Sequence, residues 1–322
     1  MQRRTFLSLT ALSFAGPWAY AGEANWPDAP IRLVVTFPPG GSSDVAARLL
    51  APHVATILGQ SVVIDNKPGG ASVIGARHVA EAKADGYTLL MSNSAPLSIS
   101  PTLMQAPPYD PVKSFSHLAY VGAVPTVFAV HPSVPVENFA QLLDWLRSQK
   151  GPTPFGSGGS ASVAHIVGEQ FAKSTGTDLL HVPYKGAGQM RSDLLGGQIL
   201  FAIDALPQNL PLAKDGRVRL LAVTSKDRVA QAPDLPTVVE LGYPQLVADN
   251  YVGVSAPAGL PEAIAVRLHQ AFTQALAIPE VQEQLQAQGF VLEEQTRAQF
   301  AEFVRQQYEA WAPVVRATGA TI

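Results

Sequence analysis

The sequence predicts an α/β protein with two lobes, each a mixed, mostly parallel sheet flanked by helices, and a ligand cleft between the lobes. Short β-branched apolar runs alternate with amphipathic segments of helical length along most of the chain. The order of strand, glycine-rich turn and helix occurs twice. Residues 22–322 also form a chain longer than a single hydrophobic core usually supports. One large doubly wound domain is the alternative.

The first 21 residues have the pattern of an export signal. Arg3 and Arg4 precede a short apolar stretch, and Ala19-Tyr20-Ala21 places small residues where signal peptidase cleaves. The stretch is well short of the roughly 20 residues that span a bilayer. Residues 3–7 also resemble a twin-arginine signal, and an ordinary Sec signal is the alternative. We therefore expect the mature protein to be exported.

Composition argues against two classes of partner. The formal charge is −3, and losing Arg3 and Arg4 with the signal makes it −5, with no basic run. This pattern disfavours nucleic acid and anionic membrane surfaces as partners. No later segment is apolar enough for membrane insertion, and a chain without cysteine at this size needs no disulfides.

The strands expected in the first half of the chain are 31–37, 61–65, 87–91, 118–121 and 127–130, and those in the second half are 153–156, 179–183, 199–203, 218–224 and one from Tyr251. The helices expected are one ending near Leu58, 70–84, 136–148, one ending at Lys173, 187–195, 208–215, 261–277 and 297–318.

Two crossings between the lobes are expected, near residues 122–125 and 248–252. They divide the chain into one lobe of 27–123 with 252–322 and a second lobe of 124–251. Ligands of such proteins bind at the interface between the lobes.

Two glycine-rich turns are the most informative local feature. Residues 37–42 (FPPGGS) and 155–160 (FGSGGS) each follow an expected strand and open a helix. Glycine lets the backbone approach a ligand, and a helix start presents unpaired N–H groups with a partial positive charge. Two such starts facing one cleft would bind a carboxylate. The alternative is that each turn only packs a helix on a strand, with Asp44 as a cap.

Other chemistries lack their sequence patterns. Neither turn matches a nucleotide-binding loop, and no G-x-S-x-G surrounds Ser42, Ser157 or Ser160. The histidines form no H-E-x-x-H pair, so a metal site is not expected. His165 either contacts ligand or packs within its lobe.

Polar residues follow three of the expected strands, where ligands of open sheets bind. Ser92-Asn93-Ser94 contacts ligand or builds a turn, and Tyr184-Lys185-Gly186 and Asp204 occupy the equivalent positions in the second half. Lys185 is open to three interpretations: a pair with Asp204, a contact to an anionic ligand, or a solvated side chain.

These motifs, in their order along the chain, resemble the substrate-binding receptors of tripartite tricarboxylate transporters, called Bug-type receptors. The resemblance covers nearly the whole mature chain and is carried by the segments 37–44, 66–70, 85–90, 155–165, 182–186 and 256–259. It implies a type II periplasmic-binding-protein fold, a periplasmic location, and a di- or tricarboxylate, acidic amino acid or aromatic acid as ligand. No cofactor and no catalytic activity are implied.

The resemblance also nominates ligand-binding residues. They are Phe37, Pro39, Gly40, Gly41, Asp44 and Asn93 in the first lobe, and Ser157, Gly158, Ser160, Ala161, Tyr184 and Asp204 in the second. Two departures affect the expected ligand pose: Ala161, and Ala71-Ser72 after Gly70, stand where the family often has glycine.

We therefore expect a monomeric receptor that closes over a carboxylate and docks on membrane permease subunits. A receptor that signals to a sensor protein, and a serine hydrolase using Ser157 or Ser160 with His165, are the alternatives.

Overall fold

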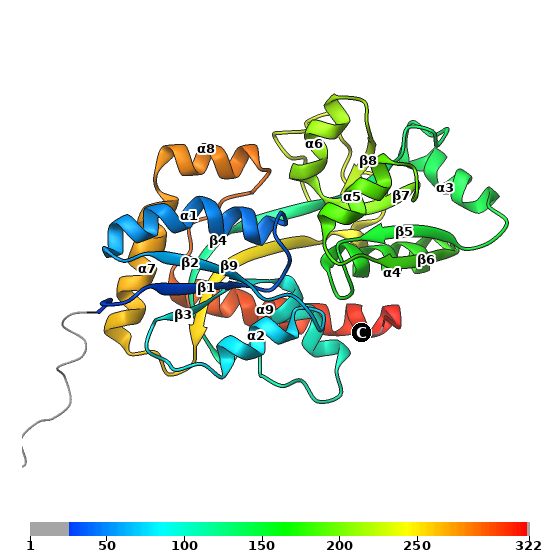
Figure 1. Ribbon diagram of the computed structural model, residues 1–322. Coiled ribbons are helices and arrows are strands. Elements are labelled where there is room, and N and C mark those ends of the chain that lie inside the picture. The colour runs from blue at the N-terminus through cyan, green and yellow to red at the C-terminus, as the bar shows by residue number, and fades with distance from the viewer. Residues whose placement is uncertain (1–25, 321–322) are drawn as a thin grey trace, which may run out of the picture.

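The computed structural model describes residues 26–320, so the expected export signal lies outside the described residues. Two lobes lie side by side, joined by two long strands that run from one lobe into the other (Figure 1). The sheet order is β2-β1-β3-β9-β4-β7-β5-β6, with β8 pairing to β4. The α/β, two-lobed fold class predicted from the sequence is confirmed.

The first lobe is built on parallel strands β1 (Ile31–Val35), β2 (Val62–Asn66) and β3 (Thr88–Asn93). Side chains alternate along a strand, so Leu33 faces one layer of helices and Val34 the other. The first layer contains α1 (Ser42–Leu58), α7 (Glu262–Leu276) and α8 (Pro279–Ala287). The second contains α2 (Val73–Ala80) and the start of α9 (Arg297–Thr318).

The second lobe repeats this design with β5 (Thr153–Ser157), β6 (Leu179–Pro183), β7 (Phe201–Ala205) and β8 (Arg219–Val223). One face of its sheet carries α3 (Phe139–Ser148) and α4 (Val163–Thr175), and the other carries α5 (Ala187–Leu195) and α6 (Leu206–Lys214). Phe128 lies at the centre of its core, 5.0 Å from the Phe171 ring centroid and 5.2 Å from that of Phe139.

The strands β4 (Phe115–Val130) and β9 (Asp249–Pro257) are antiparallel partners and connect the lobes. The expectation of separate strands at 118–121 and 127–130 is wrong, because β4 continues through Gly122 and Pro125. A register shift between Tyr120 and Gly122 accommodates the break in regular pairing there. In the described part of the chain, every antiparallel pairing of strands involves β4 or β9.

Some helix boundaries also differ from expectation. The helix expected at 70–84 begins only at Val73, because Ala71 and Ser72 have positive φ angles of 52° and 75°. Helix α8 and the short helices Ala95–Ile99, Ser100–Leu103 and Pro244–Leu246 were not predicted.

The long helix α9 contacts both lobes. Phe300 and Val304 pack in the first lobe, whereas Trp311 and Val315 belong to the main apolar cluster of the second. Lys173 Nζ of α4 donates to Ala317 O over 2.7 Å. The division of the chain into a first lobe of 27–123 with 252–322 and a second lobe of 124–251 stays a prediction. The end of α9, which this division assigns to the first lobe, packs on the second.

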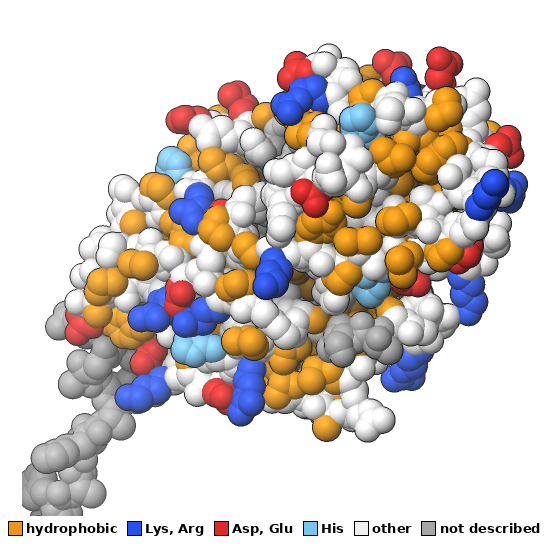
Figure 2. Space-filling view, turned by 45° about the vertical axis from the view of Figure 1, so that its right-hand side comes forward, with side chains coloured by type: hydrophobic (Ala, Val, Ile, Leu, Met, Phe, Trp, Pro, Cys, Tyr) orange, Lys and Arg blue, Asp and Glu red, His pale blue; other side chains and the backbone are white. Residues whose placement is uncertain are grey.

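The surface carries both signs of charge. On the face shown in Figure 2, Lys and Arg side chains are interspersed with Asp and Glu among the described residues. No helix within residues 26–320 is long and apolar enough to cross a bilayer.

Two helix glycines give a matched test of core packing. A Cβ at Gly168 in α4 would lie 2.1 Å from the Phe155 ring, whereas a Cβ at Gly188 in α5 would meet nothing within 4 Å. We expect Gly168→Ala to lower the free energy of unfolding by about 1–3 kcal/mol through overpacking. Gly188→Ala should leave it unchanged or raise it by up to about 1 kcal/mol. Urea unfolding followed by circular dichroism measures both, and equal stability of the two variants would contradict this packing.

Candidate functional site

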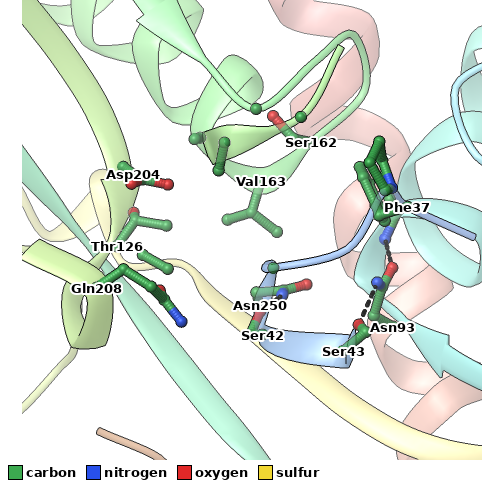
Figure 3. Close-up of a pocket in the computed structure, with 18 of the residues that line it drawn as sticks. Phe37, Ser42, Ser43, Asn93, Thr126, Ser162, Val163, Asp204, Gln208 and Asn250 are labelled. Carbon is green, nitrogen blue, oxygen red and sulfur yellow. Dashed lines mark hydrogen bonds between the residues drawn. The ribbon is translucent and has the colours of Figure 1, made fainter. Parts of the chain in front are cut away.

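A cavity lies between the lobes, beyond the ends of β1, β3 and β7 (Figure 3). It has about 700 Å³ of empty space, including the space open to solvent at its mouth. The part of this space that the centres of water-sized molecules can occupy is about 90 Å³. The first lobe contributes the turn before α1 with Asn93 and Ala95, and the second contributes the starts of α4, α5 and α6. Both lobes therefore form its walls.

The first wall is the N-terminus of α1. Gly41 is its N-cap, and the first N–H bonded within the helix is that of Val45, which donates to Gly41 O. The N–H groups of Ser42, Ser43 and Asp44 precede that bond, as at any helix start. Gly41, Ser42 and Ser43 line the cavity. Asn93 Nδ2 donates to Ser43 Oγ over 2.8 Å, and Asn250 Nδ2 donates to Ser42 Oγ over 3.2 Å.

Asp44 supports this turn from behind and does not line the cavity. Its buried carboxylate accepts hydrogen bonds from the guanidinium of Arg48, the N–H of Gly40 and Nδ2 of Asn66. Burial opposes ionisation, but these hydrogen bonds outweigh it and lower the pKa of Asp44. The charged carboxylate therefore fixes Gly40 against α1, but Asp44 is not the cap that the alternative predicted, since Gly41 is the N-cap and no side chain caps the helix.

The second wall is the N-terminus of α4. Ser162 is the N-cap, and its Oγ accepts from the N–H of His165 over 3.2 Å. Gly158, Ser162, Val163 and Ala164 line the same cavity as Gly41. The two glycine-rich turns identified in the sequence thus share one hollow.

A third helix start, that of α5, also reaches the cavity and was not predicted as an anion site. Gly186 is its N-cap, and Gly186 and Ala187 line the cavity. A Cβ at Gly186 would lie 3.2 Å from Pro38 Cγ, so the two lobes approach closely here. The glycine after the strand end at Pro183 was the sequence signal for this start.

Buried polar contacts hold the turn before α4 in shape. Ser157 Oγ lies 2.7 Å from His181 Nε2 and accepts from the N–H of Gly159. The ring of His181 stacks on that of His165 with centroids 3.8 Å apart. The Nδ1 of His165 accepts from the N–H of Ala161. His165 therefore bonds within its lobe, and the serine pair expected of a hydrolase with His165 is not formed.

A second hollow adjoins the main cavity between the lobes. It shares Phe37, Pro38, Gly158 and Gly186 with the main cavity and adds Ser160, Tyr184 and Lys185, among others. Tyr184 OH donates to Asp193 Oδ2 over 2.9 Å. Lys185 does not pair with Asp204, whose partner is Arg191.

The nominated residues therefore fall into three groups. The main cavity is lined by Phe37, Gly41, Asn93, Gly158 and Asp204. The second hollow is lined by Phe37, Gly158, Ser160 and Tyr184. The residues that line neither are Pro39, Gly40, Asp44, Ser157 and Ala161. Most of the last group shape the loops, through the hydrogen bonds of Gly40, Asp44, Ser157 and Ala161 described above.

Several cavity residues were not among those that the resemblance nominated. They are Pro38, Ser42, Ser43, Ala95, Thr126, Ser162, Val163, Ala164, Gly186, Ala187, Arg191, Ala205, Gln208 and Asn250. Arg191 and Asn250 follow no glycine-rich turn and no strand end that would have marked them, whereas Gln208 lies three residues after the end of β7. Among residues 26–320, no three His, Asp or Glu side chains are grouped so that they could hold a metal ion.

Comparison with known proteins identifies the family. Residues 46–320 match the family model described as "Tripartite tricarboxylate transporter family receptor". This chain belongs to that family. It is 38% identical over 312 residues to "Protein BugT" of Bordetella pertussis strain Tohama I, covering 97% of this chain and 96% of that protein.

Solved structures of similar proteins agree with the family assignment of this receptor. "Periplasmic binding protein BugD" superposes with a TM-score of 0.87 at 31% identity, covering 92% of this chain and 99% of that chain. The structure described as "R. palustris Rpa4515 with adipate" gives the same TM-score, identity and coverage. The suspected Bug-type family and its periplasmic-binding-protein fold are thus confirmed.

The two departures from the family pattern have a conformational explanation. Ala161 has a φ of 59°, and Ala71 and Ser72 are also left-handed. Glycine adopts this conformation without the steric cost that a Cβ brings. Ala161 is fully buried and lines neither hollow, so its side chain leaves the cavity unchanged.

The half-buried His181 makes the stability of the receptor depend on pH. Burial, and then the neighbouring His165, lower the pKa of His181 to about 3 from its usual 6.5. The unfolded chain then binds a proton at pH values where the folded protein does not. The free energy of unfolding should therefore fall as pH decreases from about 6.5 to about 3.

His181→Gln, which has no titrating ring, should flatten this dependence relative to the unchanged protein. Part of the pH dependence that remains in the variant comes from His117, because burial lowers the pKa of His117 to about 4. Urea unfolding at several pH values measures the difference. Identical pH dependence in the variant and the unchanged protein would refute the role of His181.

Proposed function

We propose that this receptor captures a small carboxylate in the periplasm and delivers it to the permease subunits of a tripartite transporter. The observation that carries the proposal is the convergence of three helix N-termini, those of α1, α4 and α5, on one cavity. Each start offers unpaired N–H groups and roughly half a positive charge. An anionic group is the natural occupant of such a site.

Relatives support the carboxylate as ligand. The superposed structure with adipate contains a dicarboxylate, and it shares the fold across nearly the whole of this chain. Delivery to a permease is supported by the family, which is described as the receptor family of tripartite tricarboxylate transporters. Export with removal of residues 1–21, action as a monomer, and the absence of nucleic-acid partners remain parts of this proposal.

The geometry favours a receptor over a hydrolase. A nucleophile must reach its substrate, but Ser157 is fully buried beneath the turn and lines neither hollow. Its Oγ is engaged by His181 and by the N–H of Gly159. The contact with His181 serves the shape of the loop. A receptor that signals to a sensor would use the same cavity, and transport is favoured by the family.

A thermal-shift screen of carboxylic acids tests the proposal. Ligand at about 100 times its Kd should add about 2.7 kcal/mol to stability, which raises the melting temperature measurably. Protection by a neutral sugar or a cation, with none by any carboxylate, would overturn the carboxylate assignment. Turnover of a simple ester by the protein would instead support the hydrolase.

Gly158→Val tests the site directly. Gly158 lines both hollows, and a Cβ there would already lie 3.3 Å from atoms of Ala187 at the start of α5. We expect the variant to weaken carboxylate binding at least tenfold, because the side chain fills the space next to two helix starts. The matched control is Gly151→Val, at an exposed site with nothing within 4 Å. Calorimetric titration gives both affinities, and unchanged binding by a folded Gly158→Val protein would place the ligand elsewhere.

A further inference from the structure

The cavity has two chemically different ends. Figure 3 shows Phe37, Ser43 and Asn93 on one side and Asp204, Thr126 and Gln208 on the opposite side. We call the wall formed by Thr126, Arg191, Asp204 and Gln208 the distal wall. Thr126, Asp204 and Gln208 lie across the cavity from the N-terminus of α1, and Arg191 contacts Asp204 while its Nη2 lies 3.5 Å from Gly40 O in the turn before α1. A ligand held at the start of α1 by a carboxylate extends its other end toward this wall.

The side chains of the distal wall carry no net charge. Arg191 Nη1 lies 3.0 Å from Asp204 Oδ2, and the two side chains are only 15% and 5% exposed. Asn209 Nδ2 donates to the same oxygen over 2.8 Å. Among the described residues that line the cavity, Arg191 and Asp204 are the charged ones. The guanidinium is thus neutralised within the wall.

Gln208 provides a second, independent observation. It lines the cavity, and its buried Nε2 and Oε1 both lack a hydrogen-bond partner. Buried polar side-chain atoms in proteins are nearly always hydrogen-bonded, so such a group requires an explanation. An amide has one donor side and one acceptor side. A ligand group that both donates and accepts would satisfy it.

We propose that the receptor selects a monocarboxylate whose far end is an uncharged group with both a donor and an acceptor, such as a primary amide, over the diacid of the same length. The inference rests on the proposed function, because it assumes a carboxylate at the helix starts. The ligand amide donates to Gln208 Oε1 and accepts from Gln208 Nε2.

A second carboxylate fits this wall poorly. It has acceptors only, so it leaves Gln208 Oε1 unpaired and lies near the carboxylate of Asp204. A second carboxylate that binds Arg191 has to share its single positive charge with Asp204, to which Arg191 Nη1 already donates. Discrimination against the diacid therefore comes from repulsion as well as from the better match of the amide.

Matched pairs of ligands test the proposal by calorimetric titration. The probes are succinate with succinamate, glutarate with glutaramate, and adipate with adipamate. For the pair of ligands whose carbon chain length gives the tightest binding, we expect the monoamide to bind at least tenfold more tightly than the diacid. Equal affinity, or tighter binding of the diacid, overturns this inference and leaves the proposed function intact. Failure of every carboxylate to bind overturns the proposed function itself.

Variants separate the effect of the charge balance between Arg191 and Asp204 from the effect of hydrogen bonds to Gln208. Asp204→Asn frees Arg191 and should shift the preference toward the diacid at least tenfold. The double variant Asp204→Asn with Arg191→Met restores a neutral wall and should keep the preference for the amide. Gln208→Leu should abolish the preference for glutaramate over pentanoate. Asp215→Asn, an exposed change of equal charge at the end of α6, is the control and should change no ratio.

Melting curves establish that each variant is folded. If a folded Asp204→Asn protein keeps the ligand preference of the unchanged protein, the neutral wall is not the determinant and the inference fails. The double variant replaces this test if the unpaired Arg191 prevents the single variant from folding. A double variant that favours the diacid likewise refutes the inference, because its wall is neutral.

Discussion

The N–H groups at the first turns of α1, α4 and α5 are the feature on which the site depends, because they supply positive potential without a free cationic side chain. They are fixed in direction by the helices that follow them, so no side-chain entropy is lost when a ligand binds. The charged side chains of the cavity, Arg191 and Asp204, neutralise each other. An anion is therefore attracted by the backbone, and its far end is selected by side chains.

Each anion-binding turn needs buried polar groups behind it. In the first lobe, the carboxylate of Asp44 is bonded to Arg48, Asn66 and the N–H of Gly40. In the second lobe, Ser157 and His165 accept from the N–H groups of Gly159 and Ala161. The two turns are supported by different groups, an ion pair in the first lobe and contacts between hydroxyl and imidazole groups in the second. Acid should act on the second turn through His181, because burial and the neighbouring His165 lower its pKa to about 3.

The sequence was sufficient for the features that depend on local pattern. Alternating strands and helices, the turns at Gly41 and Gly158, and the polar residues in the last positions of β3 and β7 were all predicted near their observed positions. It was insufficient where contacts join distant segments. Arg191 meets Asp204 across 13 residues, and Gln208 lies beside Thr126 because the end of β7, where α6 starts, pairs with the middle of β4. The continuity of β4 through Gly122 was likewise invisible, since pairing with β9 sustains it.

The walls of the cavity belong to different lobes, so the site exists only while the lobes are together. Pro38 and Gly186 approach closely across the crevice, and Arg191 Nη2 lies 3.5 Å from Gly40 O. Opening must break these contacts and bend the pair β4 and β9. It must also disturb α9, whose Trp311 packs on the second lobe while its Phe300 packs on the first. Because α9 packs on both lobes, a change in the angle between them has to move its last turns against the second lobe, and this cost favours the arrangement seen here.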